Sequence, residues 1–255
     1  MFLWYVFYWL ACAETPKPEF DLPSPLVKKH CLPLTLTPQS PEADQWLTPP
    51  EYDQLLKQHV AQNQPIIDFY CSQWADFSAQ DTLGIHADSV IADIGTGTGL
   101  LPVKLLTEGV RFRRLYAIDI DERSIAMLKN VLALAWPKVQ TVVPILSKPT
   151  DVSLPERSVD IMLSINTRLD RFLVTEAGLN HPDTLCASMK LALKPNGVLH
   201  HFEPSYIDDL GTIELDRQVK AGYQSCGVSL KPQPPIRINQ SEYLHWSGRF
   251  DVKSD

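Results

Sequence analysis

Short apolar segments alternate with segments of helical periodicity along most of the chain. Runs of strand length occur at 89–94, 115–119, 139–145, 159–165 and 197–203. Apolar positions spaced three or four residues apart predict helices at 100–108, 121–136, 182–193 and 207–221. Strands and helices that alternate in this way predict an α/β fold, with a mostly parallel sheet covered by helices on both faces.

The last two predicted strands, 223–230 and 243–252, have no helical pattern between them. Residues 231–240 contain Pro232, Pro234 and Pro235 instead. Because proline disrupts helices and central strands, we expect this segment to be a connection inside a C-terminal antiparallel hairpin. The predicted sheet is therefore doubly wound, with about seven strands.

The N-terminal part differs in composition from the rest. Residues 1–65 contain 10 of the 21 prolines and none of the 11 glycines. We therefore divide the chain into an apolar segment at 1–13, a Pro-rich arm and first helix at 14–65, and a main domain at 66–255. A second helix is predicted from the apolar stripe at 66–77.

The apolar segment 1–13 can be interpreted either as an export signal or as a segment that is not cleaved. It has the length of a signal-peptide core, and Ala11-Cys12-Ala13 is typical of a cleavage site, so one interpretation is export after cleavage near Ala13. The absence of Lys and Arg before the apolar run favours the other, a cytoplasmic protein that is membrane-associated through this segment or carries a misassigned start.

Charge and cysteine content exclude several functions. The formal net charge is -7, which opposes a sequence-independent nucleic-acid binder. The five cysteines include no C-x-x-C pair, so no metal site is predicted, and each cysteine is interpreted as a small buried hydrophobe. Export would permit disulfides, and their pairing stays open.

The candidate chemistry lies in the segment Asp93-Ile-Gly95-Thr96-Gly97-Thr-Gly99, between a strand and a helix. Glycines let a backbone turn sharply and approach a ligand, and a helix N-terminus offers free amides. Asp93 can pair with a cationic amino group. Asp119 ends the next strand, where a carboxylate suits ribose hydroxyls.

These motifs resemble those of class I S-adenosylmethionine-dependent methyltransferases. The resemblance rests on residues 93–99, on Tyr116-Ala-Ile-Asp119, on residues 158–163 and on the turn and strand at 193–199, and it spans about residues 85–230. It also places the start of the sixth strand at Ala221-Gly222-Tyr223. The family fold is Rossmann-like, with seven strands of which the last is antiparallel.

The resemblance assigns roles to the cofactor-binding candidates. It implies S-adenosyl-L-methionine as cofactor, with its amino group on Asp93, its ribose on Asp119 and its adenine packed on Ile120 and contacted by Asp151. Gly95, Thr96, Gly97 and Gly99 would form the loop under its methionine part.

The acceptor side is less specified. Asn166 follows the fourth strand and Glu203 ends the fifth, which makes them the weak catalytic candidates. Asn166 lacks the prolines of family members that methylate planar nitrogens, and the glutamate pair of protein arginine methyltransferases is missing. We therefore expect methyl transfer to a small-molecule or protein acceptor. The alternatives are an inactive methyltransferase-like binding protein and an NAD(P)-dependent oxidoreductase, which the glycine spacing and Asp93 oppose.

Overall fold

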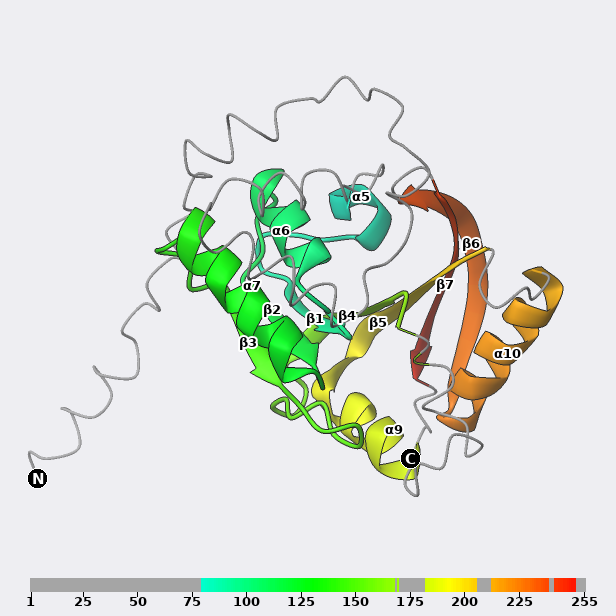
Figure 1. Cartoon of the computed structure of the whole chain (residues 1–255). Coiled ribbons are helices and arrows are strands. Elements are labelled where there is room, and N and C mark those ends of the chain that lie inside the picture. Colours follow the sequence, from blue (N-terminus) through cyan, green and yellow to red (C-terminus); the bar gives the residue numbers. More distant parts are fainter. Residues whose placement is uncertain (1–78, 168, 170–181, 206–211, 239–240, 251–255) are drawn as a thin grey trace, which may run out of the picture.

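The computed structural model describes residues 79–167, 169, 182–205, 212–238 and 241–250 (Figure 1). The predicted apolar segment at 1–13, the arm at 14–65 and the helix at 66–77 lie outside these ranges. Within them, no helix is long and apolar enough to cross a membrane.

The described residues form a seven-stranded sheet with the order β3-β2-β1-β4-β5-β7-β6. Strands β1 to β5 are mutually parallel, and β7 is antiparallel to both of its neighbours. The strands are β1 Val90–Ile94, β2 Arg114–Asp119, β3 Val142–Leu146, β4 Val159–Ile165, β5 Leu193–Pro204, β6 Val228–Ile238 and β7 Ser241–Phe250. The predicted doubly wound sheet of seven strands is therefore confirmed.

Two hydrophobic cores cover the two faces of the sheet. Ile91, Leu115 and Ile161 pack with α5 (Ala79–Leu83), α6 (Leu100–Thr107) and α7 (Glu122–Ala135). Their strand neighbours Ala92 and Tyr116 pack on the other face with α9 (Pro182–Ala192) and α10 (Thr212–Ser225) (Figure 1). Side chains alternate between the faces of a strand, so continuous apolar runs supply both cores.

Local signals explain the helix ends next to the glycine loop. Gly99 is the N-cap of α6 with φ 98°, a left-handed conformation that favours glycine. Asp121 caps α7, because its side chain accepts a hydrogen bond from Ser124 N. The start of α6 therefore ends the glycine loop, and the start of α7 ends the short loop that follows Asp119.

The prediction for the C-terminal hairpin was partly wrong. Strand β6 continues through Pro232, Pro234 and Pro235, with a register irregularity between Gln233 and Ile236. Because β6 lies at the edge of the sheet, its missing amide donors and its irregular register are tolerated there.

The predicted start of the sixth strand was also wrong, because Ala221-Gly222-Tyr223 belongs to α10. Leu215, Val219 and Tyr223 are spaced four residues apart and are all fully buried, so they form a helical stripe.

The predicted turn at 194–197 interrupts the ladder between β4 and β5. Val159 pairs with Leu193 and Ile161 with Val198, so the four intervening residues form a bulge.

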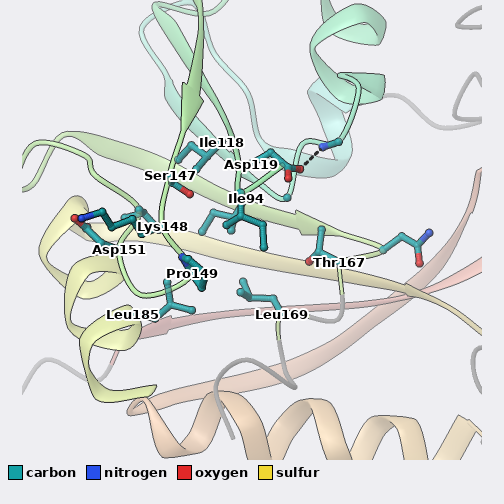
Figure 2. A pocket seen from close by; sticks show the side chains of 15 residues that line it. Ile94, Ile118, Asp119, Ser147, Lys148, Pro149, Asp151, Thr167, Leu169 and Leu185 are labelled. Carbon is teal, nitrogen blue, oxygen red and sulfur yellow. Dashed lines mark hydrogen bonds between the residues drawn. The ribbon is translucent and has the colours of Figure 1, made fainter. Parts of the chain in front are cut away.

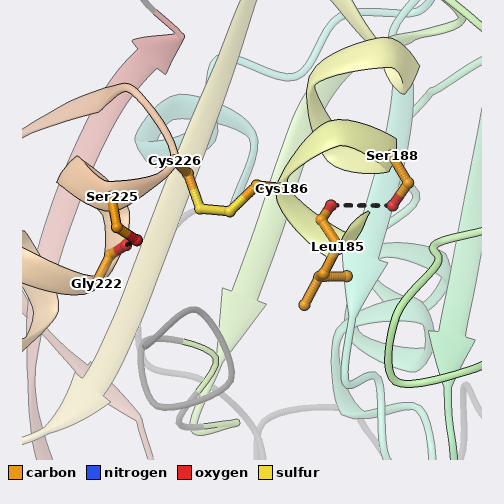
Figure 3. Close-up of a disulfide and its surroundings, with 6 residues drawn as sticks. All are labelled: Leu185, Cys186, Ser188, Gly222, Ser225 and Cys226. Atoms are coloured by element: carbon orange, nitrogen blue, oxygen red, sulfur yellow. Dashed lines mark hydrogen bonds between the residues drawn. A yellow bond between two sulfur atoms is a disulfide. The ribbon is translucent and has the colours of Figure 1, made fainter. Parts of the chain in front are cut away.

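A disulfide joins Cys186 in α9 to Cys226 after α10, with their Cα atoms 5.3 Å apart (Figure 3). The interpretation of these two cysteines as buried hydrophobes was wrong, because both are half-buried and paired. The bridge ties together the two helices on one face of the sheet. Leu185, next to Cys186, lines the pocket described below.

Candidate active site

A pocket of about 310 Å³ lies at the carboxyl ends of β1, β2 and β4 (Figure 2). Its walls come from the ends of these strands, from the loop after β3 and from α9. The lining residues are Ile94, Gly95, Gly97, Ile118, Asp119, Ile120, Ser147, Lys148, Pro149, Asp151, Val152, Asn166, Thr167, Leu169 and Leu185. Ligands of open α/β sheets bind in crevices at this edge.

The glycine loop is folded tightly against β2. The amides of Gly95 and Thr96 both donate to the carbonyl of Ile118, at 2.8 and 2.9 Å. Gly97 has φ 55°, and a Cβ built on it would meet no atom within 4 Å. The backbone at Gly97 is therefore open to the pocket, so a bound ligand can approach it closely.

Gly95 and Gly99 are needed for packing as well. A Cβ on Gly95 would overlap the methyl group of Thr167, and one on Gly99 would overlap the side chain of Leu128. Gly95 lines the pocket, whereas Gly99 lies outside its lining and lets α6 pack against α7. Sequence spacing alone did not separate these two roles.

Asp119 supports the loop and faces the pocket. Its Oδ2 accepts a hydrogen bond from Gly97 N at 2.7 Å (Figure 2). Its Oδ1 accepts one from Asp121 N at 2.9 Å. A carboxylate has about four lone-pair sites, so acceptor capacity remains for ligand hydroxyls. Burial raises the pKa of Asp119, while the hydrogen bonds from the backbone amides oppose this rise.

Asp93 lies behind the loop and is only 2% exposed. Its Oδ2 accepts a hydrogen bond from Thr96 Oγ1 at 2.7 Å, so the Thr96 hydroxyl is directed at Asp93. Burial raises the pKa of Asp93 to about 7, the Thr96 bond opposes the rise, and the nearby Asp119 adds to it. A buried carboxylate of this kind is stabilised by a cationic group placed beside it.

Ile120 and Asp151 stand on the pocket wall, as their predicted roles require. Ile120 is 50% exposed, which leaves an apolar surface for a flat ring to cover. The Asp151 carboxylate accepts hydrogen bonds from Ser153 N at 2.8 Å and from Ser153 Oγ at 3.2 Å. The same loop adds Ser147, Lys148 and Pro149, which the sequence motifs did not single out.

The two weak catalytic candidates lie in different environments. Asn166 lines the pocket with φ 51°, and its amide donates to Phe202 O at 2.8 Å. Glu203 is fully buried in β5, where its Oε1 lies 3.3 Å from His201 Nε2, and it is outside the pocket lining. The structure therefore brings Asn166, but not Glu203, to the pocket wall.

Thr167, Leu169 and Leu185 also line the pocket. Thr167 lies in the segment after the fourth strand from which the acceptor-side candidates were drawn, whereas sequence reasoning missed Leu169 and Leu185. Leu169 follows β4 closely, so the rule that binding residues follow strand ends could have found it. Leu185 gave no such signal, because its helix reaches the pocket only through tertiary packing. Within the described residues, no group of three or more His, Cys, Asp or Glu side chains is arranged to hold a metal ion.

Comparison with known families gives a match to a methyltransferase domain over residues 92–200. This segment runs from within β1 into β5 and contains the glycine loop and all of the pocket residues. Comparison with curated proteins gives no match.

Several solved structures share the fold. An S-adenosylmethionine-dependent methyltransferase from Aquifex aeolicus is 15% identical, with 81% of this chain and 100% of that chain covered and a TM-score of 0.54. The methyltransferase in a Haloferax volcanii complex with the Trm112 methyltransferase activator is 12% identical, with 78% and 97% covered and a TM-score of 0.52. The [4+2]-cyclase SpnF is 11% identical, with 81% and 98% covered and a TM-score of 0.54.

The strand order separates this fold from a classic dinucleotide-binding sheet. That sheet has the order 3-2-1-4-5-6, whereas here the antiparallel β7 lies between β5 and β6. The domain match, the strand order and the glycine loop that is hydrogen-bonded to Asp119 all point to the same kind of fold. Residues 92–200 thus match a methyltransferase domain, and the described residues share the fold of S-adenosylmethionine-dependent methyltransferases.

Proposed function

We propose that the protein transfers a methyl group from S-adenosyl-L-methionine to a small-molecule or protein acceptor that enters beside Asn166 and Thr167. The observation that carries this proposal is the pocket itself, which combines the open backbone at Gly97 with the Asp119 carboxylate and the exposed Ile120. S-adenosylmethionine supplies a methyl group that is already activated by a sulfonium.

The chain's own residues would orient this donor. Asp119 would accept the ribose hydroxyls, Ile120 would cover one face of the adenine, and Asp93 would compensate the positive amino group through the loop. Gly95 and Gly97 would let the backbone reach the methionine part. Because methyl transfer is a displacement in line with the breaking bond, positioning and exclusion of water are the main tasks of such a site.

The acceptor would enter from the side of the pocket that follows β4. Asn166 and Thr167 line this side, and Leu169 and Leu185 supply apolar surface next to them. Beyond the sheet and its helices, the described part of the chain forms no further domain. Loops after β4 and β5 would therefore recognise the acceptor.

SpnF gives a specific reason to test turnover as well as binding. That neighbour has the same fold and is described as a [4+2]-cyclase, so the fold hosts more than one chemistry. The second candidate function is accordingly a binding protein without methyl transfer.

Two measurements separate these functions. Calorimetry with S-adenosylmethionine tests the pocket. Transfer of a tritiated methyl group into a cell extract tests turnover, and the extract also supplies any activator of the kind seen in the Haloferax volcanii complex. Binding without labelling of any protein or small molecule would support the binding protein and refute methyl transfer.

We also propose a cytoplasmic location, with membrane association through residues 1–13; the Cys186–Cys226 disulfide is the observation that favours the alternative, export after cleavage near Ala13. The support is chemical, because these residues are apolar and rich in Trp and Tyr, which suits a membrane–water interface. Fractionation of cells followed by N-terminal sequencing tests this proposal. A soluble exported form that begins near residue 14 would contradict it.

A further inference from the structure

A chain of polar side chains runs from the pocket wall into the sheet. Thr167 lines the pocket, and its Oγ1 is hydrogen-bonded to Ser164 Oγ. Ser164 Oγ lies 3.2 Å from His201 Nδ1, and His201 Nε2 lies 3.3 Å from Glu203 Oε1. Ser164 is 1% exposed, and His201 and Glu203 are 0% exposed. Such a buried polar network is costly unless its members satisfy one another.

Strand register explains how this cluster forms. Ser164 in β4 is the parallel partner of His201 in β5, so their side chains lie next to each other. Glu203 is two residues beyond His201, and therefore points to the same face of the sheet. Tyr223 from α10 completes the cluster, with its hydroxyl 3.0 Å from His201 Nδ1.

The surroundings of the His201 ring indicate which nitrogen carries the proton. Two hydroxyls, from Ser164 and Tyr223, lie at Nδ1, and a carboxylate lies at Nε2. The Glu203 side chain, at ion-pair distance and not in a hydrogen bond, favours an N–H on Nε2, which leaves the Nδ1 lone pair to accept from one of the two hydroxyls. The order of hydroxyl, imidazole and carboxylate is one in which a histidine removes a proton from a hydroxyl.

We propose that Thr167, Ser164 and His201 form a proton relay and that the methyl acceptor therefore carries a proton to lose, as a hydroxyl, a thiol or an N–H nitrogen does. This inference rests on the proposed methyl transfer and narrows its substrate class. Tertiary amines and thioethers, which have no such proton, are excluded as the main acceptors.

The step balances in atoms and charge. The acceptor's lone pair forms the bond to the methyl carbon, and the electron pair of the broken carbon–sulfur bond stays on sulfur. The acceptor's proton passes to Thr167 Oγ1, the Thr167 proton passes to Ser164 Oγ, and the Ser164 proton passes to His201 Nδ1. The positive charge thus ends on His201 beside Glu203, and the proton leaves by the reverse path once the product has gone.

Several titratable groups lie around the His201 ring. Glu203 comes from its own strand and Tyr223 from α10, whereas His245 in β7 lies on the opposite face of the sheet, hydrogen-bonded to His200, and is coupled to His201 only electrostatically. Burial, followed by the neighbouring His200, lowers the pKa of His245 to about 3, so His245 remains neutral and adds no competing charge near neutral pH. The carboxylate of Asp216 accepts a hydrogen bond from Trp246, whose ring is tilted by 41° to that of His201, with the ring centroids 5.8 Å apart.

The first test needs neither donor nor acceptor. The full chain is labelled with ¹⁵N-histidine, and the His201 ring signals are assigned by their loss in His201→Gln. We expect a proton on Nε2 and none on Nδ1 near neutral pH. A protonated Nδ1 in the neutral ring would overturn the relay.

The second test compares two hydroxyls at the same nitrogen. Ser164→Ala breaks the proposed path, whereas Tyr223→Phe removes a neighbouring hydroxyl and leaves the path intact. Transfer of tritiated methyl groups into a cell extract is measured over a range of pH, with S-adenosylmethionine affinity measured by calorimetry. General-base catalysis is worth about 10²–10⁴-fold, so we expect Ser164→Ala to lower the rate by about 100-fold or more and to flatten the pH profile. Tyr223→Phe should lower the rate much less than Ser164→Ala does and should keep the pH profile, because it removes a hydroxyl outside the proposed path.

The outcomes distinguish a failure of the relay from a failure of the proposed methyl transfer. Equal losses in the two variants, or an unchanged pH profile in Ser164→Ala, would show a purely structural cluster and refute the relay alone. Absence of label with the unmodified chain would refute the proposed methyl transfer itself, and the relay with it.

Discussion

Replacement of Asp93 by Asn removes an ionisable group from the buried end of β1. Asp93 is 2% exposed, and burial raises its pKa from 3.8 to about 7, with Asp119 adding to the rise against the opposing Thr96 bond. The protein therefore binds this proton more tightly when folded than when unfolded. Asn keeps the shape and can still accept the Thr96 hydroxyl, but it has no charge to bury.

The magnitude follows from the two pKa values. A rise from 3.8 to about 7 is equivalent to about 4 kcal/mol. Because the folded-state pKa is raised, the stabilisation from protonated Asp93 is fully present below about pH 3.8 and is lost as the pH rises through about 7. We therefore expect the free energy of unfolding of Asp93→Asn, minus that of the unmodified protein, to increase by up to about 4 kcal/mol between about pH 4 and pH 8.

Urea unfolding at a series of pH values measures this difference. Asp121→Asn is the matched control. Despite partial burial, hydrogen bonds from Ser124 lower the pKa of Asp121. The free energy of unfolding of Asp121→Asn, minus that of the unmodified protein, should therefore decrease as the pH rises. A pH-independent difference for Asp93→Asn would refute the reasoning.

Binding should change in the opposite direction to stability. Calorimetry at about pH 8 should show S-adenosylmethionine affinity reduced at least about tenfold in Asp93→Asn, because the cationic amino group loses a charged partner worth about 1.5–3 kcal/mol. With the unmodified protein, affinity should rise with pH up to about 7 and then level off, since binding favours the ionised carboxylate.

Three further predictions concern the loop and the disulfide. Asp119→Ala should weaken S-adenosylmethionine binding at least about tenfold by removing ribose hydrogen bonds worth about 1.5–3 kcal/mol, and unchanged affinity by calorimetry would contradict the assigned site. Gly97→Val should abolish that binding, because its side chain would fill open space in the pocket; Gly109→Val has similar backbone strain, at φ 68°, and should retain binding. Reduction of the Cys186–Cys226 bridge, which spans 40 residues, should lower the free energy of unfolding by about 4 kcal/mol, measured by urea unfolding with and without reductant. An identical unfolding curve under both conditions would show that the bridge contributes nothing in solution.

The parts of the fold that were predicted correctly carry local signals. Strand β4, for instance, has the predicted bounds 159–165 because a buried parallel strand is a continuous apolar run. The errors fall where neighbours outweigh local preference. Prolines disfavour a strand, yet β6 contains them because an edge strand leaves some backbone groups unpaired. Tyr223 was assigned to the wrong element because an aromatic residue after a glycine reads equally well as a strand start or as the last turn of a helix.

Sequence alone determined the glycine loop, the two aspartates at strand ends and the order of strands and helices. Each of these depends on residues close together in the chain, where spacing and side-chain type limit the backbone directly. Only the tertiary structure decided that Gly95 makes room for Thr167, that Cys186 meets Cys226, and that Ser164 lies beside His201. These contacts join segments far apart in the chain, and they depend on strand register and helix packing, in which a shift of one residue turns a side chain to the opposite face.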